Sequence, residues 1–119
     1  MSDIGIESKL RKICLALDGA EETATFGHPT FRVSGKTFCV LDEHKGESAI
    51  AVKVGLPVQG VFLKDPRFYK TPYTGQHGWV SLKTKSTLDW REIEDLVKGS
   101  YRLMARRSSA ADRSVKRRQ

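Results

Sequence analysis

Basic and aromatic side chains are interleaved along the stretch from Lys64 to Lys85, in which Asp65 is the only acid. Basic side chains pair with phosphate groups and aromatic faces stack on unpaired bases, so this stretch predicts a nucleic-acid-binding surface. The alternative is structural: Phe68 and Trp79 fill the core and the lysines protect an edge strand from pairing with another chain. The basic residues are Lys64, Arg67, Lys70, Lys83 and Lys85, and the aromatic residues are Phe68, Tyr69, Tyr73 and Trp79.

Another pair of basic residues, Arg32 and Lys36, flanks the dipeptide Ser34-Gly35. Short apolar runs on both sides of this dipeptide predict a tight β-hairpin with Ser34-Gly35 as its turn. If the hairpin acts as a wing on DNA, Arg32 and Lys36 contact phosphates. Otherwise they are ordinary surface residues.

The net charge of the chain is +7, but most of it lies near the C-terminal end. Residues 106–119 carry +5, which leaves +2 for residues 1–105. A body this close to neutral gives weak support for a phosphate-binding surface, whereas a basic tail raises the affinity for any polyanion. We expect one domain over residues 1–106 and a basic tail over residues 107–119, which is disordered or extends the last helix and either binds polyanions or only aids solubility.

Motifs of common catalytic and cofactor sites are missing from the sequence. The histidines at 28, 44 and 77 lack metal-ligand spacing, and the chain has no Gly-x-Ser-x-Gly, phosphate-binding loop or dinucleotide fingerprint. Cys14 and Cys39 lie within apolar segments, which predicts buried core thiols and no zinc site. We therefore expect a protein that is not an enzyme and uses no metal or cofactor.

Neither a membrane span nor a signal peptide is indicated. No apolar run approaches the roughly 20 residues needed to cross a bilayer. The start of the chain, Met1-Ser2-Asp3-Ile4, lacks the basic and apolar segments of a secretory signal. These features predict a cytoplasmic protein without a membrane partner.

Hydrophobic spacing predicts the elements that position these residues. Apolar residues from Ile6 to Leu17 recur at helical spacing, and Gly19 suits the left-handed end of such a helix. A run of strands follows, interrupted by a turn at Gly27-His28-Pro29. Extended structure is expected to begin at residues 22–27, with strands at 30–33, 37–41 and 48–54 and a polar connection at 42–47.

The second half of the chain predicts a short helix, two further strands and a long helix. The short helix is expected to begin at Pro57 and end near Asp65-Pro66, and the long one to run from about 90 to 106. The extended segments are expected at 68–73 and 79–83. This order indicates an α+β fold, a two-layer domain whose antiparallel sheet is covered on one face by the N- and C-terminal helices. The last helix should pack through Trp90, Ile93, Val97 and Tyr101 against Phe38, Val40, Ile50 and Val52.

Three segments resemble the MmcQ/YjbR family of small bacterial proteins: residues 27–38, Gly78-Trp79-Val80, and Ser100-Tyr101-Arg102-Leu103. The resemblance covers roughly residues 6–105. It implies a two-layer domain similar to type III secretion chaperones and, more loosely, to frataxins. It also implies DNA binding, through hairpins interpreted as a double wing.

DNA is therefore the leading predicted partner of a non-catalytic binding protein. The runner-up is a protein-interaction or chaperone-like module, in which an exposed sheet or helix face takes a partner segment. A small-ligand site or an enzyme is the third hypothesis. Nucleic-acid binding predicts salt-dependent affinity, protein binding predicts an exposed apolar patch, and a ligand site predicts a pocket with converging polar groups.

Overall fold

The structure is a computed structural model that describes the backbone of residues 2–117 and the side chains of residues 5–105. Among the described residues, no helix combines the length and the apolar composition that crossing a bilayer requires. In chain order the elements are α1 (Ser2–Leu15), β1 (Ala20–Thr25), β2 (His28–Val33), β3 (Lys36–His44), β4 (Glu47–Lys53), α2 (Leu56–Leu63), β5 (Phe68–Lys70), the 3₁₀ helix η1 (Thr74–His77), β6 (Trp79–Lys83) and α3 (Trp90–Arg117).

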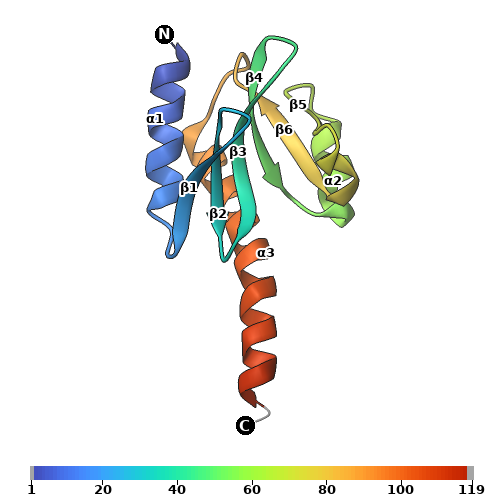
Figure 1. The fold of residues 1–119 in the computed structure, drawn as a ribbon. Helices are drawn as coiled ribbons and strands as arrows, with labels where there is room; N and C mark the ends of the chain where they lie inside the picture. The colour runs from blue at the N-terminus through green and yellow to red at the C-terminus, as the bar shows by residue number, and fades with distance from the viewer. Residues whose placement is uncertain (1, 118–119) are drawn as a thin grey trace.

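The strands form an antiparallel sheet in the order β1-β2-β3-β4-β6-β5. Figure 1 shows α3 crossing behind the sheet and α1 beside β1, and both helices contact the same layer of strands. The core lies between these helices and the sheet, with Leu10, Phe31, Ile93 and Val97 fully buried. The opposite face of the sheet, here called the open face, carries no α-helix among the described residues. This arrangement confirms the predicted α+β fold.

Tight turns connect the first four strands. Positive φ angles at both central residues, as in Ser34 (53°) and Gly35 (77°), identify type I′ turns, whose twist matches that of the strands. The first turn is Phe26-Gly27, so the predicted turn at residues 27–29 was displaced and His28 begins β2. The predicted polar connection was also too long, because β3 continues to His44 and turns at Lys45-Gly46.

A β-bulge at Phe38 changes which residues of β3 face the core. Arg32 pairs with Thr37, but Phe31 pairs with Cys39, so Phe38 is the extra residue. Phe38 and Cys39 are consequently both buried against the helices. Beyond them, the side chains of β3 that would have faced the helices face the other side of the sheet. Val40 therefore lies on the open face, and its predicted packing against α3 was wrong.

Ser100 and Tyr101 of α3 hold the bulge in place. The buried Ser100 hydroxyl donates a hydrogen bond to the carbonyl oxygen of Phe38 at 2.6 Å and accepts one from the backbone N–H of Lys53 at 2.9 Å. The ring of Tyr101 meets that of Phe38 edge to face, with 5.4 Å between centroids. In the predicted inner stripe of α3, Tyr101 and Trp90 are only half-buried, at the margin of the core.

The last helix is longer than predicted. It continues to Arg117, so the backbone of residues 107–117 is helical, which is one of the two states expected for the basic segment. Residues 118–119 lie outside the described residues, as do the side chains beyond residue 105.

Candidate functional site

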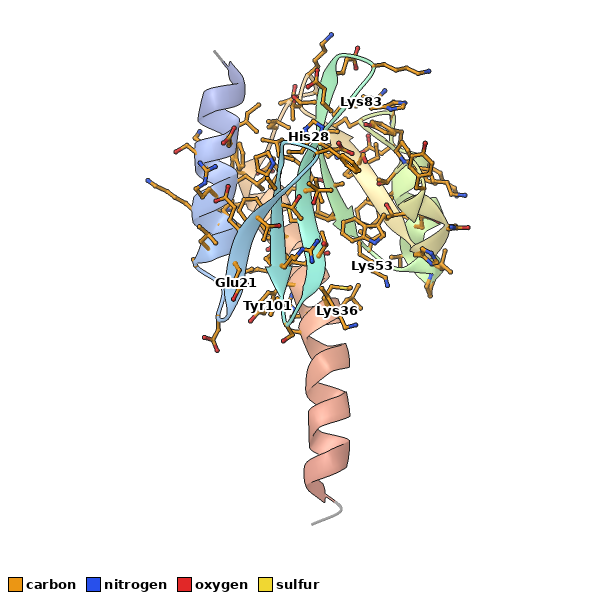
Figure 2. All side chains as sticks on the ribbon, viewed as in Figure 1. Glu21, His28, Lys36, Lys53, Lys83 and Tyr101 are labelled. Carbon is orange, nitrogen blue, oxygen red and sulfur yellow. The ribbon has the colours of Figure 1, made fainter. Side chains whose placement is uncertain are left out.

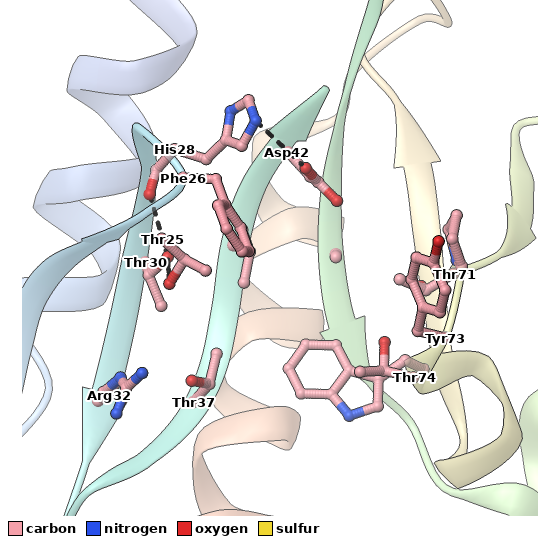
Figure 3. A pocket seen from close by; sticks show the side chains of 14 residues that line it. Thr25, Phe26, His28, Thr30, Arg32, Thr37, Asp42, Thr71, Tyr73 and Thr74 are labelled. Atoms are coloured by element: carbon pink, nitrogen blue, oxygen red, sulfur yellow. Dashed lines mark hydrogen bonds and ion pairs between the residues drawn. The ribbon is translucent and has the colours of Figure 1, made fainter. Parts of the chain in front are cut away.

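The open face carries a cleft with a volume of about 370 Å³, here called the open-face cleft. It lies between the β1–β2 turn on one side and the connection from β5 to β6 on the other (Figure 3). Four adjacent strands provide its floor, through Thr30, Val40, Ala51 and Trp79. The bulge in β3 contributes directly to this floor, because it turns Val40 away from the core.

Phe26 forms one wall of the cleft. It occupies the first central position of the type I′ turn, with a φ of 51°, where Asn, Asp or Gly is the usual residue. Its side chain is 96% exposed, so packing within this chain does not compensate the unfavourable backbone conformation. The turn instead presents an aromatic face to solvent at the mouth of the cleft.

Tyr73 forms the opposite wall, and like Phe26 it combines a positive φ with an exposed aromatic side chain. Its φ of 68° and ψ of −52°, together with a hydrogen bond from the N–H of Thr74 to the carbonyl of Pro72 at 2.7 Å, define a γ-turn. A γ-turn with positive φ is rare and strained. The ring is 93% exposed, and Figure 3 shows Phe26 and Tyr73 on opposite sides of the cleft.

The segment that carries Tyr73 is fixed to the rest of the fold by Gln59 of α2. The buried amide of Gln59 donates hydrogen bonds to the carbonyl of Gly75 at 2.7 Å and to that of Trp79 at 3.0 Å. The N–H of Gly75 also bonds to the carbonyl of Thr71 at 2.8 Å. The strained turn at Tyr73 is therefore built on a hydrogen-bonded base.

Arg32 supplies the positive charge of the cleft. Its Nε is buried and has no hydrogen-bond partner among the described residues. Glu21 lies directly opposite on β1, yet no hydrogen bond or ion pair joins the two side chains within the described part of the chain. A buried, unpaired guanidinium N–H is costly, and the terminal nitrogens of the same group can donate to an oxyanion in the cleft.

A mixed pair of charges marks the other end of the cleft. His28 Nε2 lies 3.8 Å from Asp42 Oδ1, and Figure 3 shows Arg32 well away from this pair. The hydroxyl of Thr30 donates to the carbonyl of His28 at 3.0 Å, which links the floor to this end. No group of three or more His, Cys, Asp or Glu side chains in the described residues is arranged to hold a metal ion. The arrangement suits binding of a planar group near a positive charge.

Two of the predicted basic residues are already paired within the protein. Arg67 donates to Asp65 at 2.7 Å and to Glu92 at 2.8 Å, and these hydrogen bonds raise the pKa of Arg67 and lower that of Asp65. Lys85 lies 3.3 Å from Glu47. Arg67 therefore links the segment before β5 to the start of α3, and two carboxylates already balance its charge.

The remaining predicted residues do not form one surface. Lys83 shares the open face with Arg32, because it continues the alternation of Trp79 and Ser81. Lys36 lies opposite the buried Val33, hence on the other face, and Figure 2 shows it at the far end of the sheet from Lys83. Lys64 and Lys70 are exposed at the end of α2 and on the edge strand β5.

The predicted wing is not a separate projection. Strands β2 and β3 are paired on their outer sides with β1 and β4, so only the tip at Ser34-Gly35 is free. Among the aromatic residues of the predicted surface, Phe68 is in the core, as the structural alternative required. Trp79 is 7% exposed but lies on the cleft floor, on the other face of the sheet from the core. Sequence reasoning missed Phe26, although an aromatic residue before Gly27 in a turn was a usable signal.

Comparison with known proteins places this fold in a family. The model of the YjbR family matches residues 15–103. The chain belongs to the YjbR family. The matched segment contains every strand and the whole open-face cleft, and it ends before the basic residues 106–119. No curated protein matches the sequence.

A solved structure supports the same architecture for this family member. The chain is similar to a protein from Pseudomonas syringae known from its crystal structure, with a TM-score of 0.61 and 20% sequence identity. The similarity covers 71% of this chain and 86% of the other. At this identity the comparison supports the fold alone.

Proposed function

We propose that the protein is a non-catalytic, DNA-binding protein that holds unpaired bases on the open face of its sheet. The observation that carries the proposal is the pair of almost fully exposed rings, Phe26 and Tyr73, on opposite sides of one cleft. Aromatic side chains on an open sheet are the usual platform for single-stranded nucleic acid, and stacking contributes about 1–3 kcal/mol per base.

The geometry favours unpaired over paired bases. The rings stand at a cleft of about 370 Å³, and the bases of a duplex are stacked inside the helix, where Phe26 and Tyr73 cannot reach their faces. The body is also nearly neutral, and on the open face only Arg32 and Lys83 remain from the predicted basic residues. Affinity should therefore depend on stacking more than on phosphate contacts.

Fluorescence anisotropy with a labelled oligothymidine and a labelled duplex tests the proposal. Replacing Phe26 and Tyr73 together by Leu keeps two apolar residues but removes the stacking faces, so affinity for the single strand should fall at least about tenfold. Val61→Ser is the matched control, because Val61 is an exposed apolar residue on α2, away from the cleft. Equal affinity for both DNA forms, or an unchanged double variant, would contradict the proposal.

Protein recognition remains the second candidate, and α2 is the element that favours it. Leu56, Val58 and Val61 are exposed on this helix, beside a groove that Phe62 and Leu103 line between α2 and α3. Exposed apolar side chains gathered on one helix are typical of interaction sites. Binding through this surface would respond weakly to salt and would be lost in Val61→Ser rather than in the Phe26 and Tyr73 variant.

A further inference from the structure

The size of the open-face cleft sets the size of its occupant. Its volume of about 370 Å³ lies at the lower end of the roughly 300–1,000 Å³ typical of small-molecule sites. Val40, Ala51 and Trp79 make the floor largely apolar. Such a space accommodates one ring system with a substituent.

The walls indicate that the occupant is planar. Phe26 and Tyr73 are the most exposed of the large hydrophobic side chains in the described residues, and both are held at positive φ. Two unrelated turns, a type I′ turn and a γ-turn, thus bring aromatic side chains to the same cleft. An aromatic ligand would stack on these exposed rings.

The charges indicate where the occupant is negative. Arg32 lines the cleft, and its terminal guanidinium nitrogens can donate to the oxygens of a carboxylate or phosphate there. Asp42 at the other end disfavours a second anionic group there. The expected ligand therefore carries one oxyanion, on the Arg32 side.

We propose that the open-face cleft is a discrete site for a single aromatic ring bearing an oxyanion, with Phe26 and Tyr73 against the ring and Arg32 on the oxyanion. The inference rests on the proposed function, because it uses the same cleft. It adds that one nucleotide unit is sufficient for recognition. A free aromatic carboxylate has the same chemistry, so the test includes both sources.

Isothermal titration calorimetry of the full chain tests whether the ring, the oxyanion or both are needed for binding. The probes are thymidine 5′-monophosphate, thymidine, inorganic phosphate and indole-3-carboxylate. Binding by the monophosphate or the carboxylate, at least about tenfold tighter than by thymidine or phosphate, supports the site, since a hydrogen-bonded ion pair contributes at this level. Binding by the monophosphate alone identifies a nucleotide site, and binding by the carboxylate alone identifies a metabolite site. Equal affinities for all four probes, or no binding by any, would overturn the inference.

Variants locate the binding in the cleft. Arg32→Gln should bring the affinity for the monophosphate down to that for thymidine. Arg32→Lys should retain part of the difference between these two affinities, because lysine keeps the positive charge but lacks the planar pair of donors of the guanidinium. Lys85→Gln is the control, since that lysine is paired with Glu47 outside the cleft. A melting curve of each variant establishes that it is folded. An effect of Lys85→Gln as large as that of Arg32→Gln would contradict the site.

The outcomes also separate this inference from the proposed function. If the oligothymidine binds and neither small ligand does, the single-ring site is wrong and DNA binding stands. If a small ligand binds in an Arg32-dependent manner and the oligothymidine does not, DNA binding is wrong and the site stands.

Discussion

Two aromatic residues at positive φ connect the stability of this protein with its proposed function. Phe26 gains little from packing in the folded chain because its side chain is 96% exposed, yet it occupies a left-handed backbone position. Only Gly, and to a lesser degree Asn and Asp, adopt that conformation without penalty. An aromatic residue at position 26 suits the proposed stacking on bases, whereas Gly, Asn or Asp would suit the turn better.

Replacing Phe26 by Asn should consequently stabilise the protein while weakening oligothymidine binding. We expect the free energy of unfolding to rise by about 0.5–1 kcal/mol, because Asn relieves most of the left-handed strain. Urea denaturation followed by circular dichroism measures the change. A loss of more than about 1 kcal/mol would show that the ring packs in the folded protein, since that is the size of an ordinary destabilising substitution.

The cysteines should be inert in the native protein. Cys14 and Cys39 are both fully buried, and burial, followed by the hydrogen bond with Cys14, raises the pKa of the Cys39 thiol well above its ordinary value. The thiolate is the reactive form, so a raised pKa lowers reactivity at neutral pH, and a moderate rise in pH should restore little of it. Labelling with a thiol reagent should occur only after denaturant is added. Rapid native labelling of either residue would contradict their placement in the core.

At the scale of elements, the junction between β4, α2 and β6 depends on Gly78. Its carbonyl accepts hydrogen bonds from the N–H groups of Val54 at 2.9 Å and Gly55 at 3.1 Å. A Cβ at this position would lie 2.7 Å from the carbonyl carbon of Gly55, closer than backbone atoms tolerate. This contact sets α2 against β6, from where Gln59 supports the turn that carries Tyr73.

Gly78→Ala should therefore destabilise the fold more than a glycine substitution that introduces only backbone strain. Gly46→Ala is the matched control, because Gly46 has a φ of 81° but a Cβ added there would meet no other atom within 4 Å. We expect Gly78→Ala to cost about 1–3 kcal/mol more than the control, the range for overpacking a rigid site. Thermal and denaturant melts measure both variants. Equal losses would mean that the backbone at Gly55 yields without penalty.

The sequence predicted the elements better than it predicted their boundaries. Hydrophobic periodicity located the helices and strands, and the Ser34-Gly35 turn was confirmed. The bulge at Phe38 was not visible, because no local pattern encodes the long-range hydrogen bond from Ser100 that accompanies it. The extra residue in the bulge places Val40 on the open face instead of the helix face. The sequence pattern therefore did not predict Val40 as part of the cleft floor.

The predicted basic residues lie on different faces of the fold for the same physical reason. Basic residues were chosen by their proximity in sequence, but strand pairing sends Arg32 and Lys36 to opposite faces, and folding brings Glu92 to Arg67. The aromatic walls come from two turns far apart in the chain. Only the register and the three-dimensional fold place Phe26 and Tyr73 at one cleft.

For the whole molecule, charge and stacking are separable contributions to DNA binding. The net charge of residues 106–119 is +5, against +2 for the rest of the chain. Phosphate contacts determine how steeply affinity falls with salt, whereas stacking of bases on aromatic rings is largely independent of salt. The basic C-terminal segment should therefore control the salt dependence, and the open-face cleft should control the affinity that remains at high salt.

Removing the charge of this segment should flatten the salt dependence without abolishing binding to oligothymidine. For single strands each neutralised phosphate contributes about −0.7 to the slope of log affinity against log salt. Deleting residues 107–119, with five basic residues, should therefore reduce the magnitude of the slope by up to about 3.5. A full-length variant with those five residues changed to Gln controls for the loss of chain length. The double variant Phe26→Leu and Tyr73→Leu should instead lower the affinity at every salt concentration and leave the slope unchanged. If the deletion instead removes all affinity at low salt, binding belongs to the basic segment alone, and the open face has no part in it.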